Sequence, residues 1–405
     1  MIADYFKIAI KTLMKRKTRS LLTIVGIFLA IVTIFVLLSL SLGLNEYVNS
    51  QFENLGTDKF FIMAKGQAGA PGSGGAVELT KADVNIVEKV NGVDKVAYVA
   101  IGNAKIEFKD KSRYYMVMGI PLDSQDSIDL FFKSLNVGID EGRLLKHGDQ
   151  KKIMIGYNYK YKNLFDKPVR TGDKIKINDV EFQVIGILEA IGNPQDDQQV
   201  YISYDNFKEI YNSGDRVDYI YVSIKTGEDL KTVADRTERK LMSFRNVDKK
   251  TIDFTVQTPE ELLAIFGTIL NILTAFLVGI GMVSIVVGGI GIANTMYTSV
   301  LERNKEIGTM KAIGAKNSDI LLIFVIEAGI LGLLGGSLGL VGGIGIAKAV
   351  EFGATYAGYN IIKASMNPIL IVGCLLFAFL IGIISGLAPS YQASKLKPVD
   401  TLRYE

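Results

Sequence analysis

The sequence is poor in the residues that build metal centres and disulfides. Its 405 residues include one cysteine (Cys374), one histidine (His147), eight prolines and no tryptophan. A single cysteine excludes a disulfide within the chain and any cysteine-based zinc or iron–sulfur site. A Ser-His-Asp triad would have to use His147, which lies in a hydrophilic turn and is expected to be solvated. We therefore predict no catalytic residues, no metal site and no cofactor bound by this chain.

Charge and composition exclude two further classes. The net charge of +3 is too small to predict a nucleic-acid partner. A chain with 49% hydrophobic residues is not a disordered polymer, which needs low hydrophobicity and high net charge. The positive mean hydropathy of +0.27 is the unusual value.

Four apolar blocks account for that hydropathy. The first, Leu21 to Leu42, is 22 residues without a charge, about the length needed to cross a bilayer core of ~30 Å as a helix. The second has 40 uncharged residues between Glu261 and Glu302. As one helix it would be about 60 Å long, which predicts a stalk that continues into a span. The third, Ile320 to Ala347, contains only the charge of Glu327, and the fourth, Ala364 to Ser394, contains none. We predict four transmembrane helices.

The basic residues predict the orientation. No A-x-A-like cleavage site follows the first block, which argues against a signal peptide. Lysines and arginines cluster before the first block, between the second and third, and after the fourth. By the positive-inside rule both termini and the 302–319 loop are cytoplasmic, in a multi-pass protein of the cell membrane. The clustered residues are Lys11, Lys15, Arg16, Lys17, Arg19, Arg303, Lys305, Lys311, Lys316, Lys395, Lys397 and Arg403.

The polar segment 45–258 is typical of an α/β or α+β domain outside the membrane. Thr80 is expected to cap a helix over Lys81 to Val90, and Asp229 to Phe244 predicts another. Hairpins are expected around the turns at 109–112 and 177–180, with a further strand over Tyr219 to Ile224. The fold class is therefore a four-helix integral membrane protein with a large α/β (α+β) domain inserted between the first two spans.

Several polar features of the chain are expected to lack a function. The glycine-rich stretch 66–75 lacks the pattern of a phosphate-binding loop and predicts a surface loop. The pairs Asp140-Glu141 and Asp196-Asp197 are expected to be surface charge. For residues 1–20, with Ile2, Phe6, Ile10 and Leu13 on one helical face, two interpretations stay open. One is an amphipathic helix on the cytoplasmic membrane surface, and the other is an extension of the first span.

The loop from Leu301 to Ser318 carries the strongest signal. It is rich in helix formers up to Ala312, and Gly314 is a suitable residue to end such a helix. From the residues alone, a solvated connector and a functional surface helix are equally supported.

A family resemblance favours the functional helix. The motif E-R-x-K-E-I-G-x-x-K-A-I-G-A at 302–315 resembles the cytoplasmic signature of MacB/FtsX-type ABC transporter permeases. Similarity extends over essentially the whole chain, with the loop motif the most specific part. The other matching segments lie at 9–27, 141–143, 155–156, 164–165, 172–173, 182–186 and 389–405.

The resemblance implies a mechanism and partners. Such permeases act as dimers, as a homodimer or with a closely related permease, and they associate with two copies of an ABC-type ATPase. ATP hydrolysis is transmitted through the spans to the outer domain, which is called mechanotransmission and serves export or extraction of a substrate. MacB itself carries its ATPase at the N-terminus. Here about 20 residues precede the first span and no Walker A motif occurs, so ATP is expected to bind a separate, cytoplasmic ATPase.

The resemblance leaves two functions open, a transporter and an FtsX-like, non-transporting regulator of an extracytoplasmic partner protein. In both, the predicted ATPase-coupling surface consists of Glu302, Arg303, Glu306, Ile307, Gly308, Lys311, Ala312 and Gly314.

Two features of the third block bear on packing. Glu327 would cost ~2.5–3.5 kcal/mol at a bilayer centre. We favour a structural role, bonding a neighbouring helix or the coupling helix, over a proton or substrate role. The glycines that follow have small-xxx-small spacings that predict close helix contact with membrane neighbours. They include Gly332, Gly336, Gly339 and Gly343.

These inferences divide the chain into nine parts. In order they are the N-terminal segment 1–20, span 21–44, outer domain 45–258, stalk and span 259–300, coupling loop 301–318, span 319–350, outer loop 351–367, span 368–390 and cytoplasmic tail 391–405.

Overall fold

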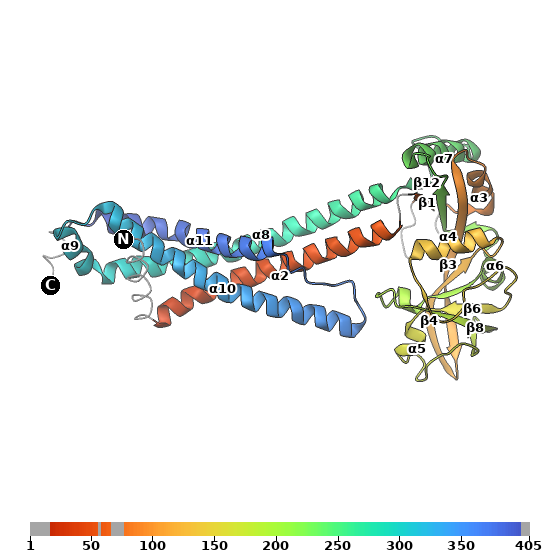
Figure 1. Ribbon diagram of the computed structural model, residues 1–405, viewed down its shortest axis with the longest axis horizontal. Helices are drawn as coiled ribbons and strands as arrows, with labels where there is room; N and C mark the ends of the chain where they lie inside the picture. The colour runs from red at the N-terminus through yellow and green to blue at the C-terminus, as the bar shows by residue number, and fades with distance from the viewer. Residues whose placement is uncertain (1–16, 56–57, 66–76, 398–405) are drawn as a thin grey trace. The chain divides into compact units, whose positions relative to one another are not determined.

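The computed structural model describes residues 17–55, 58–65 and 77–397, which belong to two units (Figure 1). The helical unit comprises the described residues up to Glu46 together with 268–356 and those from Ile362 onward. The sheet unit comprises the described residues from Tyr47 to Gly267 and residues 357–361. The N-terminal amphipathic face, the glycine-rich stretch 66–75 and the last residues of the tail lie outside the described ranges.

Each of the four predicted apolar blocks forms a long helix. The described residues contain four helices that are long and apolar enough to cross a membrane. They are α2 (Lys17–Leu55), α8 (Pro259–Glu302), α10 (Asn317–Ala357) and α11 (Pro368–Lys395).

All four helices continue beyond the predicted spans, and three of them do so by more than one turn. Helix α2 passes residue 44, α10 passes residue 350 and α11 passes residue 390. The apolar run ends at those points, but no helix breaker follows at once. Helix α10 instead stops before Gly358, whose φ of 97° lies in the left-handed region that glycine tolerates best.

Helix α8 confirms that the stalk and the second span form one element of 44 residues. Its start is fixed by a capping box, in which the Glu261 carboxylate accepts the Thr258 N–H at 3.2 Å and the Thr258 hydroxyl accepts the Glu261 N–H at 3.3 Å. Pro259 occupies the first turn, where its missing N–H costs nothing.

The sheet unit is built on ten connected strands in the order β12-β1-β11-β3-β4-β9-β6-β8-β5, with β7 paired to β3 and β8. A separate pair joins β2 to β10. The strands are β1 (Lys59–Ala64), β2 (Leu79–Thr80), β3 (Val93–Phe108), β4 (Lys111–Ile120), β5 (Ile139–Gly142), β6 (Lys152–Ile155), β7 (Lys174–Ile177), β8 (Val180–Leu188), β9 (Val200–Ser203), β10 (Arg216–Val217), β11 (Tyr219–Ile224) and β12 (Phe254–Gln257). The helices are α3 (Lys81–Glu88), α4 (Gln125–Leu135), α5 (Asn158–Tyr161), α6 (Tyr204–Tyr211) and α7 (Leu230–Arg245), with a 3₁₀ turn at Asp196–Gln198.

The long strand β3 explains why this sheet is buried on both faces. Its even-numbered residues, such as Val96 and Tyr98, join one apolar cluster, and its odd-numbered residues, such as Val99 and Ile101, join another that includes Phe131 of α4. This division follows from the two-residue period of a strand.

Both predicted hairpins are present. Lys109 and Asp110 connect β3 to β4, and Asn178 and Asp179 connect β7 to β8, all four with positive φ between 44° and 67°. Two positive φ angles in a two-residue turn match the twist of the flanking strands.

The paired acids Asp196-Asp197 were wrongly predicted to be surface charge. Asp197 is buried and its carboxylate accepts the N–H groups of Ile191 (2.6 Å) and Gly192 (3.2 Å). Burial raises the pKa of both carboxyl groups. The pair lies next to the turn at Gly192, and a chain that turns there leaves backbone N–H groups that an aspartate can satisfy. By contrast, His147 is exposed as expected, with its Nδ1 2.5 Å from the Leu122 carbonyl.

Candidate functional site

The predicted coupling loop forms a short helix, α9 (Asn304–Ala312), separated from α8 by one residue. That residue, Arg303, has φ −108° and ψ 14°, outside the helical region. At the other end Gly314 has φ 104°, its N–H donates to Lys311 O at 3.1 Å, and the Ala315 N–H donates to Met310 O at 3.0 Å. These two bonds form a Schellman motif, which confirms the predicted helix end.

A buried ion pair holds the start of α9 against α10. Arg303 Nη1 donates to Glu327 Oε2 at 3.1 Å, and the two side chains are only 6% and 3% exposed. The guanidinium also lies over the Phe324 ring, 5.1 Å from its centroid. Glu327 therefore has the structural partner expected from sequence, and that partner is Arg303 of the coupling loop.

Arg303 also makes contact within its own segment. Its Nε donates to Glu306 Oε2 at 2.9 Å, one turn into α9. The Glu306 side chain is 66% exposed, so this carboxylate also faces solvent.

The eight predicted coupling residues divide between two faces of the loop. Arg303, Ile307 and Gly308 are buried, and Ile307 packs in the apolar cluster of the helical unit. Lys311 is half-buried and its Nζ donates to the carbonyls of Ser394 and Leu396. The exposed members are Glu302, Glu306, Ala312 and Gly314.

Comparison with known proteins gives the family. Residues 20–240 match the model of the MacB-like periplasmic core domain, and residues 278–398 match that of the FtsX-like permease C-terminal region. Over the full chain, 37% of residues are identical to an uncharacterized ABC transporter permease of Methanocaldococcus jannaschii, of which 98% is covered. The chain belongs to the MacB/FtsX-type ABC transporter permeases.

Two further relatives show how such permeases are organised. An uncharacterized ABC transporter permease of Bacillus subtilis is 26% identical over the full length of both chains. The macrolide export ATP-binding/permease protein MacB of Bdellovibrio bacteriovorus is 30% identical over 98% of this chain, which spans only 61% of that protein. Permeases of this family work with an ABC-type ATPase.

The structure adds exposed residues of this permease that sequence reasoning missed. Ile313 is 82% exposed and Leu301 is 67% exposed, and Lys305 and Thr309 lie on the same exposed side of the loop. The spacing could have revealed Lys305 and Thr309. Together with Glu302 and Glu306 they recur at three- and four-residue intervals opposite the buried Ile307.

The four predicted glycines lie at two helix crossings of this permease. A Cβ at Gly332 or Gly336 would collide with Ala378 of α11, and at Gly332 it would also come within 3.0 Å of Gly382 Cα. A Cβ at Gly339 would meet Ile31 of α2 at 2.9 Å, and one at Gly343 would meet Phe35 of α2 at 3.0 Å. The four glycines are spaced four, three and four residues apart, so they lie on one stripe of α10, which packs against α11 at Gly332 and Gly336 and against α2 at Gly339 and Gly343.

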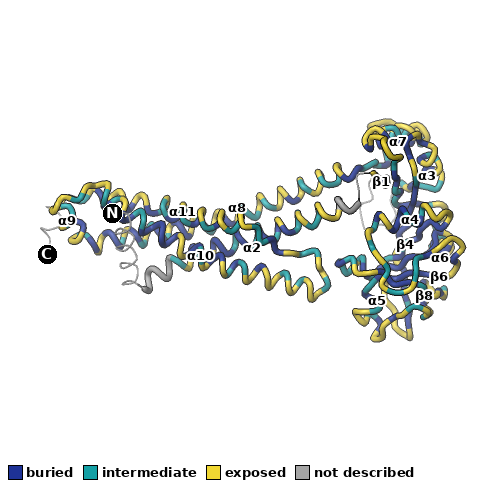
Figure 2. The backbone as a smooth tube through the Cα atoms, in the orientation of Figure 1, coloured by how far each residue is buried: buried dark blue, intermediate teal, exposed yellow. Residues whose placement is uncertain are grey.

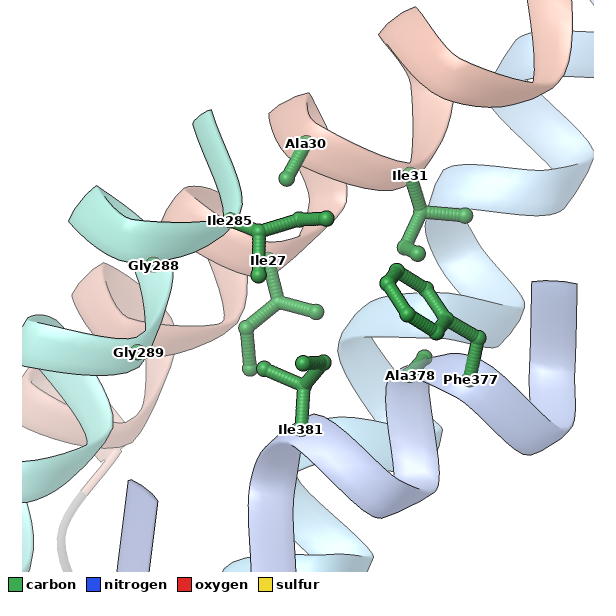
Figure 3. Close-up of a pocket in the computed structure, with 9 residues that line it drawn as sticks. All are labelled: Ile27, Ala30, Ile31, Ile285, Gly288, Gly289, Phe377, Ala378 and Ile381. Carbon is green, nitrogen blue, oxygen red and sulfur yellow. The ribbon is translucent and has the colours of Figure 1, made fainter. Parts of the chain in front are cut away.

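Helices α2, α8 and α11 enclose an apolar gap (Figure 3). Its volume of ≈ 10 Å³ is at the lower limit for one water molecule, and no polar side chain lines it. The lining therefore offers no polar side chain to a water molecule or a polar substrate. The gap is lined by Ile27, Ala30, Ile31, Ile285, Gly288, Gly289, Phe377, Ala378 and Ile381.

Proposed function

We propose that α2, α8, α10 and α11 cross the cell membrane with both termini in the cytoplasm. The α9 segment and its flanks carry Lys305, Lys311 and Lys316, whereas the connection 358–367 carries only Lys363. Cationic loops remain on the cytoplasmic side, which leaves the sheet unit outside the cell membrane.

On the cytoplasmic side, α9 docks a separate ABC-type ATPase, which binds the ATP. The observation that carries this proposal is the two-faced structure of the loop. Its inner face is fixed to the helical unit by Ile307 and by the Arg303–Glu327 pair, while its outer face is exposed. A force applied to the outer face therefore reaches the long helices. The docking surface consists of Leu301, Glu302, Lys305, Glu306, Thr309, Ala312 and Ile313.

Replacing Ile313 with aspartate tests this docking surface. A central apolar anchor contributes about 2 kcal/mol or more, so retention of the ATPase should weaken roughly 30-fold. The chain is purified from membranes after co-expression, in turn, with each stand-alone ABC-type ATPase of its genome, and retained ATPase is quantified.

Ile313→Val is the matched control and should retain the ATPase. Glu306→Lys should weaken retention as well, since it reverses a charge at the rim. Full retention by both Ile313→Asp and Glu306→Lys contradicts docking on α9.

Two copies of the permease assemble along α8, which gives two ATPase sites. The helix is exposed over much of its length (Figure 2). Seven of its exposed apolar residues repeat at alternating intervals of four and three residues, the spacing of a coiled-coil seam. The seam contains Ile269, Leu273, Phe276, Ile280, Val283, Val287 and Ile290.

Cysteine cross-linking tests the α8 seam. In a Cys374→Ser background, Phe276→Cys should form disulfide-linked dimers in membranes, because seam positions of two helices face each other. Leu376→Cys on α11 has a similar exposure, 57% against 67% for Phe276, and should remain monomeric on a denaturing gel. Equal cross-linking at both positions argues against the seam.

ATP hydrolysis then drives a conformational change of the sheet unit that exports or extracts a substrate. The gap between α2, α8 and α11 is small and apolar, which favours mechanotransmission over passage of a polar substrate between those helices. Efflux from proteoliposomes that contain the permease and its ATPase is the test. Hydrolysis without efflux or extraction favours a regulator of an extracytoplasmic protein.

A further inference from the structure

Lys311 is a second charged side chain that bonds α9 to the rest of the helical unit. It lies near the C-terminus of α9, whereas Arg303 lies at its start. Lys311 Nζ donates to Ser394 O at 2.5 Å and to Leu396 O at 2.7 Å. Ser394 lies in the last turn of α11 and Leu396 is the residue that caps it. The last carbonyls of a helix have no donor within the helix, so an ammonium group is a favourable partner for them.

The surroundings strengthen this contact. Ala393 and Ser394 are buried, and Ala393 belongs to the same apolar cluster as Ile307 of α9. Met310 and Leu396 pack against this cluster. The positive charge of Lys311 also lies at the negative end of the α11 dipole. Side-chain packing and charge thus act together where α9 meets α11.

The two cationic residues connect α9 to different helices. Arg303 bonds Glu327 of α10 at the start of α9, and Lys311 bonds the end of α11 near the C-terminus of α9. We propose that Lys311 is a positioning residue, which makes α11 follow the coupling helix and does not itself bind the ATPase. This inference rests on the proposed function, in which an ATPase moves α9.

The alternative is that Lys311 is a docking contact, as its place in the loop motif suggests. The two roles differ in outcome. A docking lysine is needed to hold the ATPase. A positioning lysine is needed only for α11 to move with α9. Without it the exposed face of α9 remains intact, and Arg303 still connects α9 to α10.

The test combines ATPase retention with pulsed EPR on the complex in lipid nanodiscs. In a Cys374→Ser background, one spin label is placed per chain, either at Ile369 of α11 or at Val341 of α10, which are 80% and 70% exposed. Distances between the two copies are measured with and without ADP–vanadate. The variants are Lys311→Met, Lys311→Arg and Lys316→Met, the last removing an exposed lysine from the same loop.

If Lys311 is a positioning residue, the four chains should give the following retention and distance shifts. Lys311→Met should retain the ATPase within twofold of the unmodified chain and keep the vanadate-induced shift at Val341. It should lose at least half of the shift at Ile369. Lys311→Arg should restore that shift, since a guanidinium can donate to both carbonyls, and Lys316→Met should behave like the unmodified chain.

Three results overturn this inference alone. They are loss of ATPase retention in Lys311→Met, an unchanged shift at Ile369, and an equal loss of both shifts. An unmodified chain that retains no ATPase, or shows no shift at either label, overturns the proposed function instead, and the inference with it.

Discussion

A permease with alanine in place of Glu327 is expected to lose about 3 kcal/mol of folding free energy, because the buried Arg303 guanidinium then loses its buried carboxylate and keeps only the exposed carboxylate of Glu306. The measurement is the midpoint of thermal unfolding of the purified chain in nanodiscs. ATPase retention should fall as well, since Arg303 also sets the angle at which α9 leaves α8.

Two variants make this prediction specific. Glu351→Ala removes a carboxylate of the same helix that pairs with Lys348 at 2.7 Å but is 26% exposed, so its loss should cost about 1 kcal/mol or less. The double variant Arg303→Met/Glu327→Met should regain most of the lost stability, because no unpaired charge remains buried. Equal losses for Glu327→Ala and Glu351→Ala contradict a structural role of the pair.

Replacing Gly332 with leucine should disrupt the crossing of α10 and α11. The obstacle is the backbone of Ala378 and Gly382, which cannot rotate away as a side chain could. Overpacking costs about 1–3 kcal/mol, and this position should reach or exceed the upper value. The yield of monodisperse protein and the unfolding midpoint should both fall.

The same helix supplies the control for Gly332. Gly345 of α10 has open space where a Cβ would be, so Gly345→Leu should leave the unfolding midpoint within a few degrees of the unmodified chain. If Gly332→Leu is tolerated as well as Gly345→Leu, α10 and α11 do not pack closely against each other at Gly332.

Elements governed by local rules could be predicted from the sequence. The hairpin turns at Lys109-Asp110 and Asn178-Asp179, the cap at Thr80 and the helix end at Gly314 each depend on a few neighbouring residues. The four long helices follow from uninterrupted apolar runs. In each case the residues that determine the structure lie within one segment of the chain.

Features that join distant segments could not be predicted in the same way. The sequence marks Glu327 as a buried charge in need of a partner, but Arg303 is 24 positions away in a loop rich in other cations. Likewise, nothing near Lys311 indicates that its amine reaches carbonyls more than 80 positions later. The motif shows which residues matter, whereas their division into an inner and an outer face depends on tertiary packing.

Helix α8 has a mechanical consequence. It is a single helix of 44 residues whose only proline lies in the first turn, so it can behave as a stiff rod about 66 Å long. If one end of such a rod is held, a tilt of about 5° displaces the other by about 6 Å. A sub-ångström rearrangement beside Arg303 could therefore be enlarged several-fold by lever geometry, without any change in the internal structure of the rod.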